Sequence, residues 1–401
     1  MRRDNYQIFS EGKIGNLTLP NRLVRSATWD PSILKSREMT DEVLRLYRNL
    51  ALGGVGLIIT GGFPVFQEQT LKDSPNKWIS TYTDLRVKGI EHMAHLVHTS
   101  RQECRIIAQL ENGNLNARPS VIKSPHSRRK QRRLTVEEIA DIVGCFVEAI
   151  VDMKKAGFDG VQLHAAHGGL LSRFLSPYTN RRNDAYGGST SNRVRIIQEI
   201  ISKARQFVGN FPILVKINCT DYLEGGVNID ILPEQAREIK QTGADAIEVS
   251  GGMWECLFRG EQELGFRPVP APESHTRIKN PEKQNYFLKY AEKLDLSIPV
   301  ILVGGNRDVE RLEEIVNQGK VDFIALSRPL IREPDLPKNW LEGRGSRTPE
   351  CISCNSCIYS MHIHPGKLEP GLVTCIHKND KSQHRAAQKW LASWVRRNAP
   401  H

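Results

Sequence analysis

Short apolar runs alternate with longer amphipathic stretches along most of the chain. The short runs are nearly continuous in Val, Ile and Leu, which is typical of parallel strands buried on both faces. The longer stretches have a helical period, and some begin with a capping residue, such as Thr40, Asp308, or Thr135 with Glu138 three positions later. Strands are predicted at residues 23–28, 56–62, 105–112, 159–166, 212–219, 244–252, 299–305 and 321–329, and the main helices at 40–52, 135–156, 191–208, 232–242 and 309–318.

Eight strand-then-helix units in one chain predict an α/β fold, a TIM (β/α)8 barrel, with a hairpin before it at about residues 8–19. A doubly wound sheet is the alternative. It is disfavoured because no G-x-G-x-x-G motif follows the first strand and no G-x-x-x-x-G-K-[ST] motif occurs anywhere. Ligands of a barrel bind at the C-terminal ends of its strands, so the residues at these ends form the candidate site.

Polar residues or glycine pairs stand at the predicted strand ends. The last two ends carry Gly304-Gly305 and Ser327-Arg328, at the positions where this fold usually binds phosphate. Glycines let the backbone approach a ligand closely, and an arginine can bind phosphate through two hydrogen bonds. The alternative is that the glycines only end a strand and that Arg328 pairs with a helix carboxylate.

The net charge of +11 and the pI near 9.3 raise the question of nucleic-acid binding. Two segments account for the whole excess: residues 123–133 hold six cations and no acid, and residues 376–401 carry a net charge of +5. Because no basic face remains on the folded part, nucleic acid is disfavoured, and both segments are expected to be solvated. Trp390 and Trp394 are expected to dock the tail helix on the body or on a partner.

The mean hydropathy of −0.42 and the absence of a run of about 20 apolar residues predict that the chain does not span a membrane. The N-terminus lacks the apolar core of a secretory signal. We therefore expect a cytoplasmic protein whose eight cysteines serve metal or redox chemistry rather than disulfides. Four of them stand singly and are expected in the core or at its edge: Cys104, Cys145, Cys219 and Cys256.

The sequence resembles the Old Yellow Enzyme family of FMN-dependent barrels, and most closely the branch of 2,4-dienoyl-CoA reductase and trimethylamine dehydrogenase. The most specific stretch runs from Ala156-Gly-Phe-Asp-Gly-Val-Gln-Leu-His-Ala-Ala-His-Gly through Phe174-Leu-Ser-Pro to Asn192-Arg193. Other matching segments follow in family order, and the resemblance covers about residues 7–375. They are Asn21-Arg22, Gly53-Gly-Val-Gly-Leu-Ile-Ile, Val303-Gly-Gly and Ser327-Arg-Pro-Leu-Ile.

The resemblance implies a non-covalent FMN across the barrel mouth. Gln109 would hydrogen-bond the pyrimidine edge of the ring system, and Lys216 would stabilise the negative charge of the reduced ring. Backbone contacts to the ring would come from Ser26, Ala27, Thr28 and Gly62, and phosphate contacts from Gly304, Gly305, Ser327 and Arg328.

The predicted catalytic residues are Lys216 and the pair His164 and His167. By the resemblance, the two imidazoles would bind the flavin edge and polarise a substrate carbonyl. Neutral imidazoles suit this role because each ring offers one donor and one acceptor nitrogen.

The substrate side departs from the family pattern. Many relatives carry a proton-donating tyrosine where this chain has Gly169, which leaves the proton to water or to another acid. The usual Gln-Leu-x-His-x-Gly-Arg segment reads Gln109-Leu-Glu-Asn-Gly-Asn-Leu, without the His and the Arg, and Trp29 replaces a small residue. The expected flavin site is therefore intact, whereas the acceptor site is altered.

Three cysteines spaced as Cys351-x2-Cys354-x2-Cys357, with Cys375 farther on, predict a metal site. Relatives in the resembled branch place a [4Fe–4S] cluster here, although 17 residues separate Cys357 from Cys375 in this chain. Zinc is the alternative, held by four cysteines or by three with a histidine, and free buried thiols are the third interpretation. The histidines within reach are His362, His364 and His377.

These patterns predict an FMN-dependent NAD(P)H oxidoreductase that transfers hydride through flavin N5 to an activated unsaturated acceptor. The alternatives are a flavin-dependent dehydrogenase or demethylase that passes electrons to a partner protein, and a non-catalytic partner-binding barrel. Small-molecule substrates are expected, and an electron-transfer protein and a homo-oligomer are compatible with the sequence. The expected division is a barrel at 1–345, a cysteine segment at 346–378 and a basic tail at 379–401, without the FAD- and NAD(P)H-binding portion of longer relatives.

Overall fold

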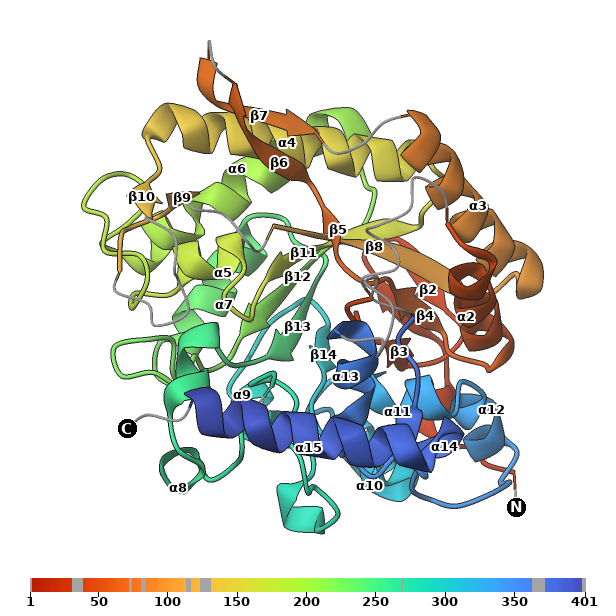
Figure 1. Cartoon of the computed structure of the whole chain (residues 1–401). Coiled ribbons are helices and arrows are strands. Elements are labelled where there is room, and N and C mark those ends of the chain that lie inside the picture. The colour runs from red at the N-terminus through yellow and green to blue at the C-terminus, as the bar shows by residue number, and fades with distance from the viewer. Residues whose placement is uncertain are drawn as a thin grey trace.

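The computed structural model describes residues 2–30, 39–71, 74–80, 84–112, 117–122, 131–268, 270–362 and 372–398. Eight parallel strands close into a barrel, because each pairs with the next and β11 also pairs with β8 (Figure 1). This confirms the predicted TIM barrel. The strands are β3 (Leu23–Arg25), β4 (Leu57–Ile59), β8 (Arg105–Glu111), β11 (Gly160–Ala165), β12 (Ile213–Asn218), β13 (Ala246–Ser250), β14 (Val300–Leu302) and β15 (Phe323–Leu326).

Helices follow the strands on the outside of the barrel. The predicted capping box of α4 is present, since the Thr135 side chain accepts from the Glu138 N–H and the Glu138 side chain accepts from the Thr135 N–H. Helix α6 begins one residue earlier than expected because Ser189 caps it by accepting from the Asn192 N–H. The main helices are α2 (Asp41–Leu52), α3 (Asp84–Ser100), α4 (Val136–Lys155), α6 (Thr190–Val208), α7 (Leu232–Gln241), α9 (Leu288–Ala291) and α10 (Val309–Asn317).

The predicted N-terminal hairpin closes the barrel at the N-terminal ends of its strands. Its strands β1 (Gly12–Ile14) and β2 (Leu17–Leu19) pair antiparallel. Ile14 and Leu19 join a buried apolar cluster with inward-facing strand residues such as Leu57, Ile107 and Phe323. The barrel interior near the N-terminal strand ends is therefore an apolar core, and the polar inward-facing residues lie nearer the C-terminal strand ends.

Two connections were not predicted. A hairpin of β6 (Phe66–Leu71) and β7 (Ser74–Ser80) stands over α4 after the short strand β5 (Phe63–Pro64). The chain between β13 and β14 carries only short helices, including η2 (Trp254–Phe258) and α8 (Glu261–Leu264). Neither region has a long periodic pattern from which its elements could be predicted.

The C-terminal segment packs across the barrel. It forms α11 (Arg328–Arg332), α12 (Leu336–Leu341), α13 (Ser356–His362), α14 (Ile376–Asn379) and the long helix α15 (Lys381–Asn398), which crosses the lower part of Figure 1. The ring of Trp390 lies 5.6 Å from that of Tyr359, so α15 docks on the cysteine segment. The side chains of His362 and Trp394, residues 123–130 of the basic stretch and His364 lie outside the described part of the chain.

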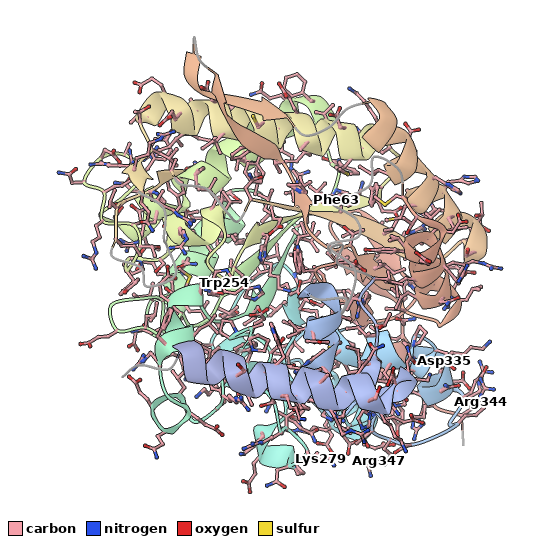
Figure 2. All side chains as sticks on the ribbon, in the orientation of Figure 1. Phe63, Trp254, Lys279, Asp335, Arg344 and Arg347 are labelled. Carbon is pink, nitrogen blue, oxygen red and sulfur yellow. The ribbon has the colours of Figure 1, made fainter. Side chains whose placement is uncertain are left out.

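Labelled residues in Figure 2 illustrate the difference between buried apolar and exposed charged side chains. Phe63 is only 3% exposed, whereas Asp335, Arg344 and Arg347 lie at the edge of the molecule in this view. Among the helices that the structure describes, none is long and apolar enough to cross a membrane.

Candidate functional site

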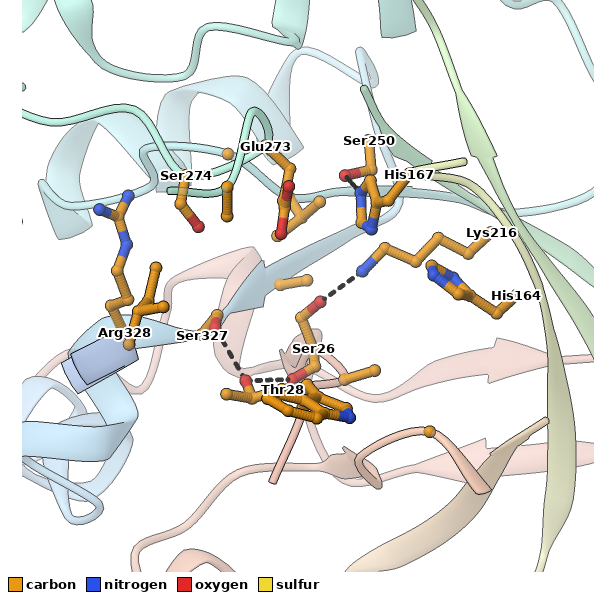
Figure 3. Close-up of a pocket in the computed structure, with 18 of the residues that line it drawn as sticks. Ser26, Thr28, His164, His167, Lys216, Ser250, Glu273, Ser274, Ser327 and Arg328 are labelled. Atoms are coloured by element: carbon orange, nitrogen blue, oxygen red, sulfur yellow. Dashed lines mark hydrogen bonds between the residues drawn. The ribbon is translucent and has the colours of Figure 1, made fainter. Parts of the chain in front are cut away.

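A cavity of about 880 Å³ opens at the C-terminal ends of the barrel strands (Figure 3). Every residue predicted to bind FMN or to act in catalysis lines it. The structure thus brings together side chains that lie up to about 300 positions apart in the sequence. They are Ser26, Ala27, Thr28, Gly62, Gln109, His164, His167, Lys216, Gly304, Gly305, Ser327 and Arg328.

The floor of the cavity is a buried hydrogen-bond network. The Lys216 Nζ atom lies 3.1 Å from Glu248 Oε1 and 3.1 Å from Ser26 Oγ. Glu248 Oε2 accepts from Gln162 Nε2 at 2.7 Å, and Gln162 Oε1 accepts from Gln109 Nε2 at 2.8 Å. Buried charges are tolerated when they are paired and hydrogen-bonded, and this network meets both conditions.

Glu248 and Gln162 were not among the predicted site residues. Glu248 is fully buried in a strand that reads Ala-Ile-Glu-Val-Ser, and Gln162 is fully buried in Val-Gln-Leu-His. Both face inward because side chains alternate along a strand, and both have polar neighbours across the register, Lys216 for Glu248 and Gln109 for Gln162. A lone polar residue inside an apolar strand was therefore the available signal.

The two histidines lie side by side, with ring centroids 5.1 Å apart. The His167 ring contacts Ser250 Oγ through Nε2 at 2.7 Å, whereas the buried His164 Nδ1 atom has no hydrogen-bond partner among the described residues. Burial, with a further contribution from Lys216, lowers the pKa of His164 to about 3. Burial also lowers the pKa of His167 well below its usual value. Both imidazoles are therefore neutral near pH 7, as the sequence analysis expected.

Arg328 lies at the opposite end of the cavity from His164 and Lys216 (Figure 3). Its Nη1 atom donates to the His275 carbonyl at 2.9 Å and to Asn355 Oδ1 at 2.6 Å. Both of these partners are neutral acceptors, so the contacts seen do not support the alternative in which Arg328 pairs with a helix carboxylate.

The glycine pair after β14 has a packing reason. Gly304 and Gly305 have φ values of 109° and 74°, in the region that favours glycine. A Cβ atom on Gly304 would lie 2.5 Å from the Phe287 ring, and one on Gly305 would lie 2.8 Å from the Tyr286 ring. Aromatic packing behind the cavity therefore requires both glycines, in addition to any ligand in front of them.

We call the opposite flank of the cavity the β8 side and define it by Gly62, Glu111, His164 and Gly169. A Cβ atom on Gly62 would lie 2.6 Å from Glu111 Cγ, so the glycine makes room for this carboxylate side chain. A Cβ atom on Gly169 would lie at ordinary distances of 3.5–3.7 Å from its neighbours, and its φ of −62° suits any residue. Burial raises the pKa of Glu111 to about 7.

The four C-terminal cysteines line a second, small cavity of about 20 Å³ beside the first. Cys357 lines both cavities, and burial raises the pKa of its thiol to about 12. The Arg332 Nη1 atom contacts Cys375 Sγ at 3.7 Å. Within the described ranges, no three Cys, His, Asp or Glu side chains are grouped closely enough to hold a metal ion. The other four cysteines are buried single thiols, as predicted.

The large cavity fits FMN by its chemistry. It offers a cation and two neutral imidazoles at one end and a guanidinium at the other. The buried Nδ1 atom of His164, a residue that lines the cavity, has no hydrogen-bond partner among the described residues. The cysteine cavity offers the four thiols that a cluster needs, but their arrangement in this structure is not that of metal ligands.

Comparisons with known proteins agree with this chemistry. The chain is 33% identical over 365 residues to an NADH oxidase of Thermoanaerobacter brockii, with 88% of this chain and 53% of that protein covered. It is 30% identical over 344 residues to an NADPH dehydrogenase of Listeria welshimeri, with coverages of 83% and 94%. A structure of 2-naphthoyl-CoA reductase in complex with 2-naphthoyl-CoA has a similar fold, with a TM-score of 0.72, 24% identity, and coverages of 87% and 54%.

The chain thus spans about half the length of the NADH oxidase that it matches. Residues 7–346, which include the whole barrel, match the model of one protein family. This match, together with the cavity at the strand ends, identifies the chain as a member of the NADH:flavin oxidoreductase / NADH oxidase family of FMN-dependent oxidoreductases.

Proposed function

We propose that this protein uses FMN to transfer hydride from NAD(P)H to an activated unsaturated acceptor. One observation carries the proposal: a single cavity joins Lys216 and a neutral histidine pair at one end to Arg328 at the other. Such a cavity suits a ligand with a polar ring at one end and a phosphate at the other. The names of two relatives, an NADH oxidase and an NADPH dehydrogenase, support nicotinamide as the reductant.

Bound FMN would supply two-electron chemistry between the nicotinamide and the acceptor. The chain would supply charge and orientation. Lys216, fixed by Glu248 and Ser26, would face the part of the ring that becomes negative on reduction. Gln109, held by Gln162, would orient the ring, together with backbone groups of Ser26, Ala27, Thr28 and Gly62.

The phosphate would lie between the strand ends β14 and β15. Two carbonyl-type acceptors fix the direction of the Arg328 guanidinium and, because they are neutral, do not cancel its charge. Thr28 and Ser327 share a hydrogen bond of 2.8 Å at the same end and offer hydroxyl groups. Gly304 and Gly305 would add backbone N–H donors.

His164 and His167 would bind the acceptor as neutral hydrogen-bond donors. Because both rings are neutral near pH 7, each carries a single N–H and can donate from only one nitrogen. The contact with Ser250 holds the His167 ring, and His164 is free to direct a nitrogen to a ligand. This histidine pair would polarise the carbonyl of an acceptor that lies over the flavin ring.

We further propose that Cys351, Cys354, Cys357 and Cys375 bind a [4Fe–4S] cluster. Support comes from the one cavity that all four line and from its contact with the flavin cavity through Cys357. Zinc is the alternative. Iron and acid-labile sulfide measured after anaerobic purification separate the two, because one zinc per chain without sulfide would contradict the cluster.

The second candidate is a dehydrogenase or demethylase that passes electrons to a partner protein, which the position of Cys357 between the two cavities favours. The third is a non-catalytic barrel. We also propose that the chain is divided into barrel, cysteine segment and tail, as the sequence predicts, and that the protein is cytoplasmic.

The test is anaerobic purification followed by a visible spectrum and identification of the released cofactor. We expect FMN, reduction by NADH or NADPH, and reoxidation by a simple enone such as cyclohexenone. A flavin-free protein that cannot be reloaded with FMN would favour the non-catalytic barrel. Flavin that is reduced by an amine or another C–H donor, but not by nicotinamide, would favour the second candidate.

A further inference from the structure

We infer that Glu111 is the proton donor that completes reduction of the acceptor, in the place of the tyrosine that the chain lacks at Gly169. This inference rests on the proposed function. It names the residue that protonates the acceptor carbon after hydride has been added to its neighbour.

The position of Glu111 follows from the barrel. Gln109 and Glu111 face inward on the same strand, because side chains alternate. Gln109 pairs with Gln162 in the register of β8 and β11, and the ladder ends at Leu110 with Leu163. Glu111 and His164 are the residues that follow this last pair on the two strands. Glu111 thus lies one layer above the network that would hold the flavin ring, at the mouth where an acceptor must enter.

The neighbourhood of Gly169 points to the same flank. A Cβ atom on Gly169 would lie 3.6 Å from His164 Cδ2 and 3.7 Å from the carbonyl oxygen of Asn112, the residue after Glu111. The Leu170 N–H also donates to that carbonyl at 2.8 Å. The end of β8 therefore borders the space that a residue-169 side chain would occupy, and Gly62 leaves room for the Glu111 carboxyl beside it.

The charges around Glu111 allow it to hold a proton. His164 and His167 are neutral, Lys216 is paired with Glu248, and Arg173 is paired with Glu255 at 2.8 Å. Arg118 and Glu273 line the same cavity from β9 (Ala117–Arg118) and from the β13–β14 connection. Burial is the cause that raises the pKa of Glu111 to about 7, so both protonation states are accessible near neutral pH.

The step balances in atoms and electrons. The acceptor carbon–carbon double bond takes a hydride at one carbon, with NAD(P)H as the source of the two electrons, and its π pair moves toward the conjugated carbonyl. The O–H bond of Glu111 then breaks, its proton goes to the other carbon, and the electron pair stays on the carboxylate. Water reprotonates Glu111 before the next turnover.

The test uses the flavin-loaded full chain and compares Glu111→Gln with wild type in anaerobic single-turnover reactions with cyclohexenone. A positioned general acid contributes roughly 10²–10⁴ in rate, so we expect a loss of that size in flavin reoxidation and the disappearance of its decline above about pH 7. Flavin content and the rate of flavin reduction by NAD(P)H are measured on the same samples. Glu103→Gln, an exposed glutamate just before β8, is the matched control.

A second variant separates proton donation from mere shape. Glu111→Gln combined with Gly169→Tyr should recover part of the lost rate, because the tyrosine hydroxyl would enter the bordering space. Infrared difference spectra give a readout independent of turnover: the wild type should show a protonated carboxyl band that titrates near pH 7 and is missing in Glu111→Gln.

Three outcomes would overturn the assignment: reoxidation of Glu111→Gln at the wild-type rate with an unchanged pH profile, a carboxyl band that survives the substitution, or a loss of equal size in Glu273→Gln alone. Failure of the proposed function looks different. In that case the wild type itself lacks flavin, or its reduced flavin does not react with the enone, and the role of Glu111 falls with it.

Discussion

The two flanks of the large cavity are built on different principles. On the side of β14 and β15, which we call the β15 side and define by Thr28, Gly304, Gly305, Ser327 and Arg328, the geometry is fixed by packing behind the cavity. On the β8 side, Gly62 makes room for Glu111, and a side chain at position 169 would meet its neighbours only at ordinary contact distances. The β15 side is therefore constrained by the packing behind it, whereas the β8 side can accept a side chain at position 169.

The β15 side also contacts the cysteine segment. Arg328 donates to Asn355, and the Arg307 guanidinium donates to Ser353 at 2.9 Å and to the Cys351 carbonyl. The cysteine segment is thus attached to the flank that would bind the phosphate, while the β8 side has no such attachment among the contacts described. Changes in the cysteine segment should accordingly reach the cofactor before they reach the acceptor.

The largest expected effect is that of Cys357→Ser. If the four cysteines hold one cluster, this substitution should remove the iron completely and weaken FMN retention, because structural metal sites contribute folding free energy directly. Metal analysis and flavin content measure both effects. The control is Cys104→Ser, which replaces a buried single thiol, and this variant protein should keep the iron content of the wild type. Full iron content in Cys357→Ser would remove this cysteine from the proposed ligand set.

The buried ion pair on the cavity floor should give the next largest effect. Lys216→Met leaves Glu248 charged and fully buried, and removing one partner of a buried pair costs about 3–5 kcal/mol in the free energy of unfolding. Denaturant titration measures this change, and adding Glu248→Gln should recover part of it.

The surface offers a matched pair for comparison. Lys320 contacts Glu292 at 2.7 Å with both side chains 34% exposed, so Lys320→Met should change stability by less than about 1 kcal/mol. Equal effects at the two lysines would show that the floor network is not held by its charges.

Arg328→Ala tests the β15 side directly. Loss of a charge-assisted contact to phosphate should weaken FMN binding by about 2–3 kcal/mol, and Arg328→Lys should lose less because it keeps the charge. Flavin fluorescence titration of the apoprotein gives the dissociation constants, with exposed Arg344→Ala as the control. Unchanged FMN affinity in Arg328→Ala would show that the phosphate does not bind at Arg328. The β15 side would then no longer be the phosphate flank of the cavity.

The last expected effect is on stability in mild acid and needs no substitution. Burial lowers the pKa of His164 and of His275 to about 3, below the ordinary value of 6.5. Between these values the unfolded chain binds protons that the folded chain excludes, so stability falls as the pH drops below about 6.5. The slope is at most about 1.4 kcal/mol per group and pH unit.

Thermal unfolding between pH 7 and pH 5 measures that slope. His275 stacks between Phe266 and Tyr286, at ring distances of 3.5 and 3.8 Å, so His275→Phe keeps the ring stack and removes one titrating group. We expect a shallower decline in this variant. A wild type whose stability does not change over this range would contradict the neutral state of the buried histidines.

The sequence by itself determined the barrel and the set of residues around its mouth. Eight apolar runs of strand length, each followed by a helical pattern, suffice to specify a closed parallel sheet, and strand-end residues must then converge because parallel strands end on one side. This is why His164, Lys216 and Arg328 were found together although they lie far apart in the chain. The observed strands are shorter than the apolar runs: β3, for example, ends at Arg25, whereas the apolar run continues to residue 28.

Tertiary structure alone decided the partners. Glu248 and Gln162 belong to the floor network because the register places them opposite Lys216 and Gln109, and register depends on how all eight strands close. The same closure sets Glu111 beside Gly62 and the end of β8 beside Gly169, which residue types and spacing do not encode. Sequence periodicity fixes which face of a strand a side chain occupies, whereas its distance to another strand's side chain is a property of the assembled barrel.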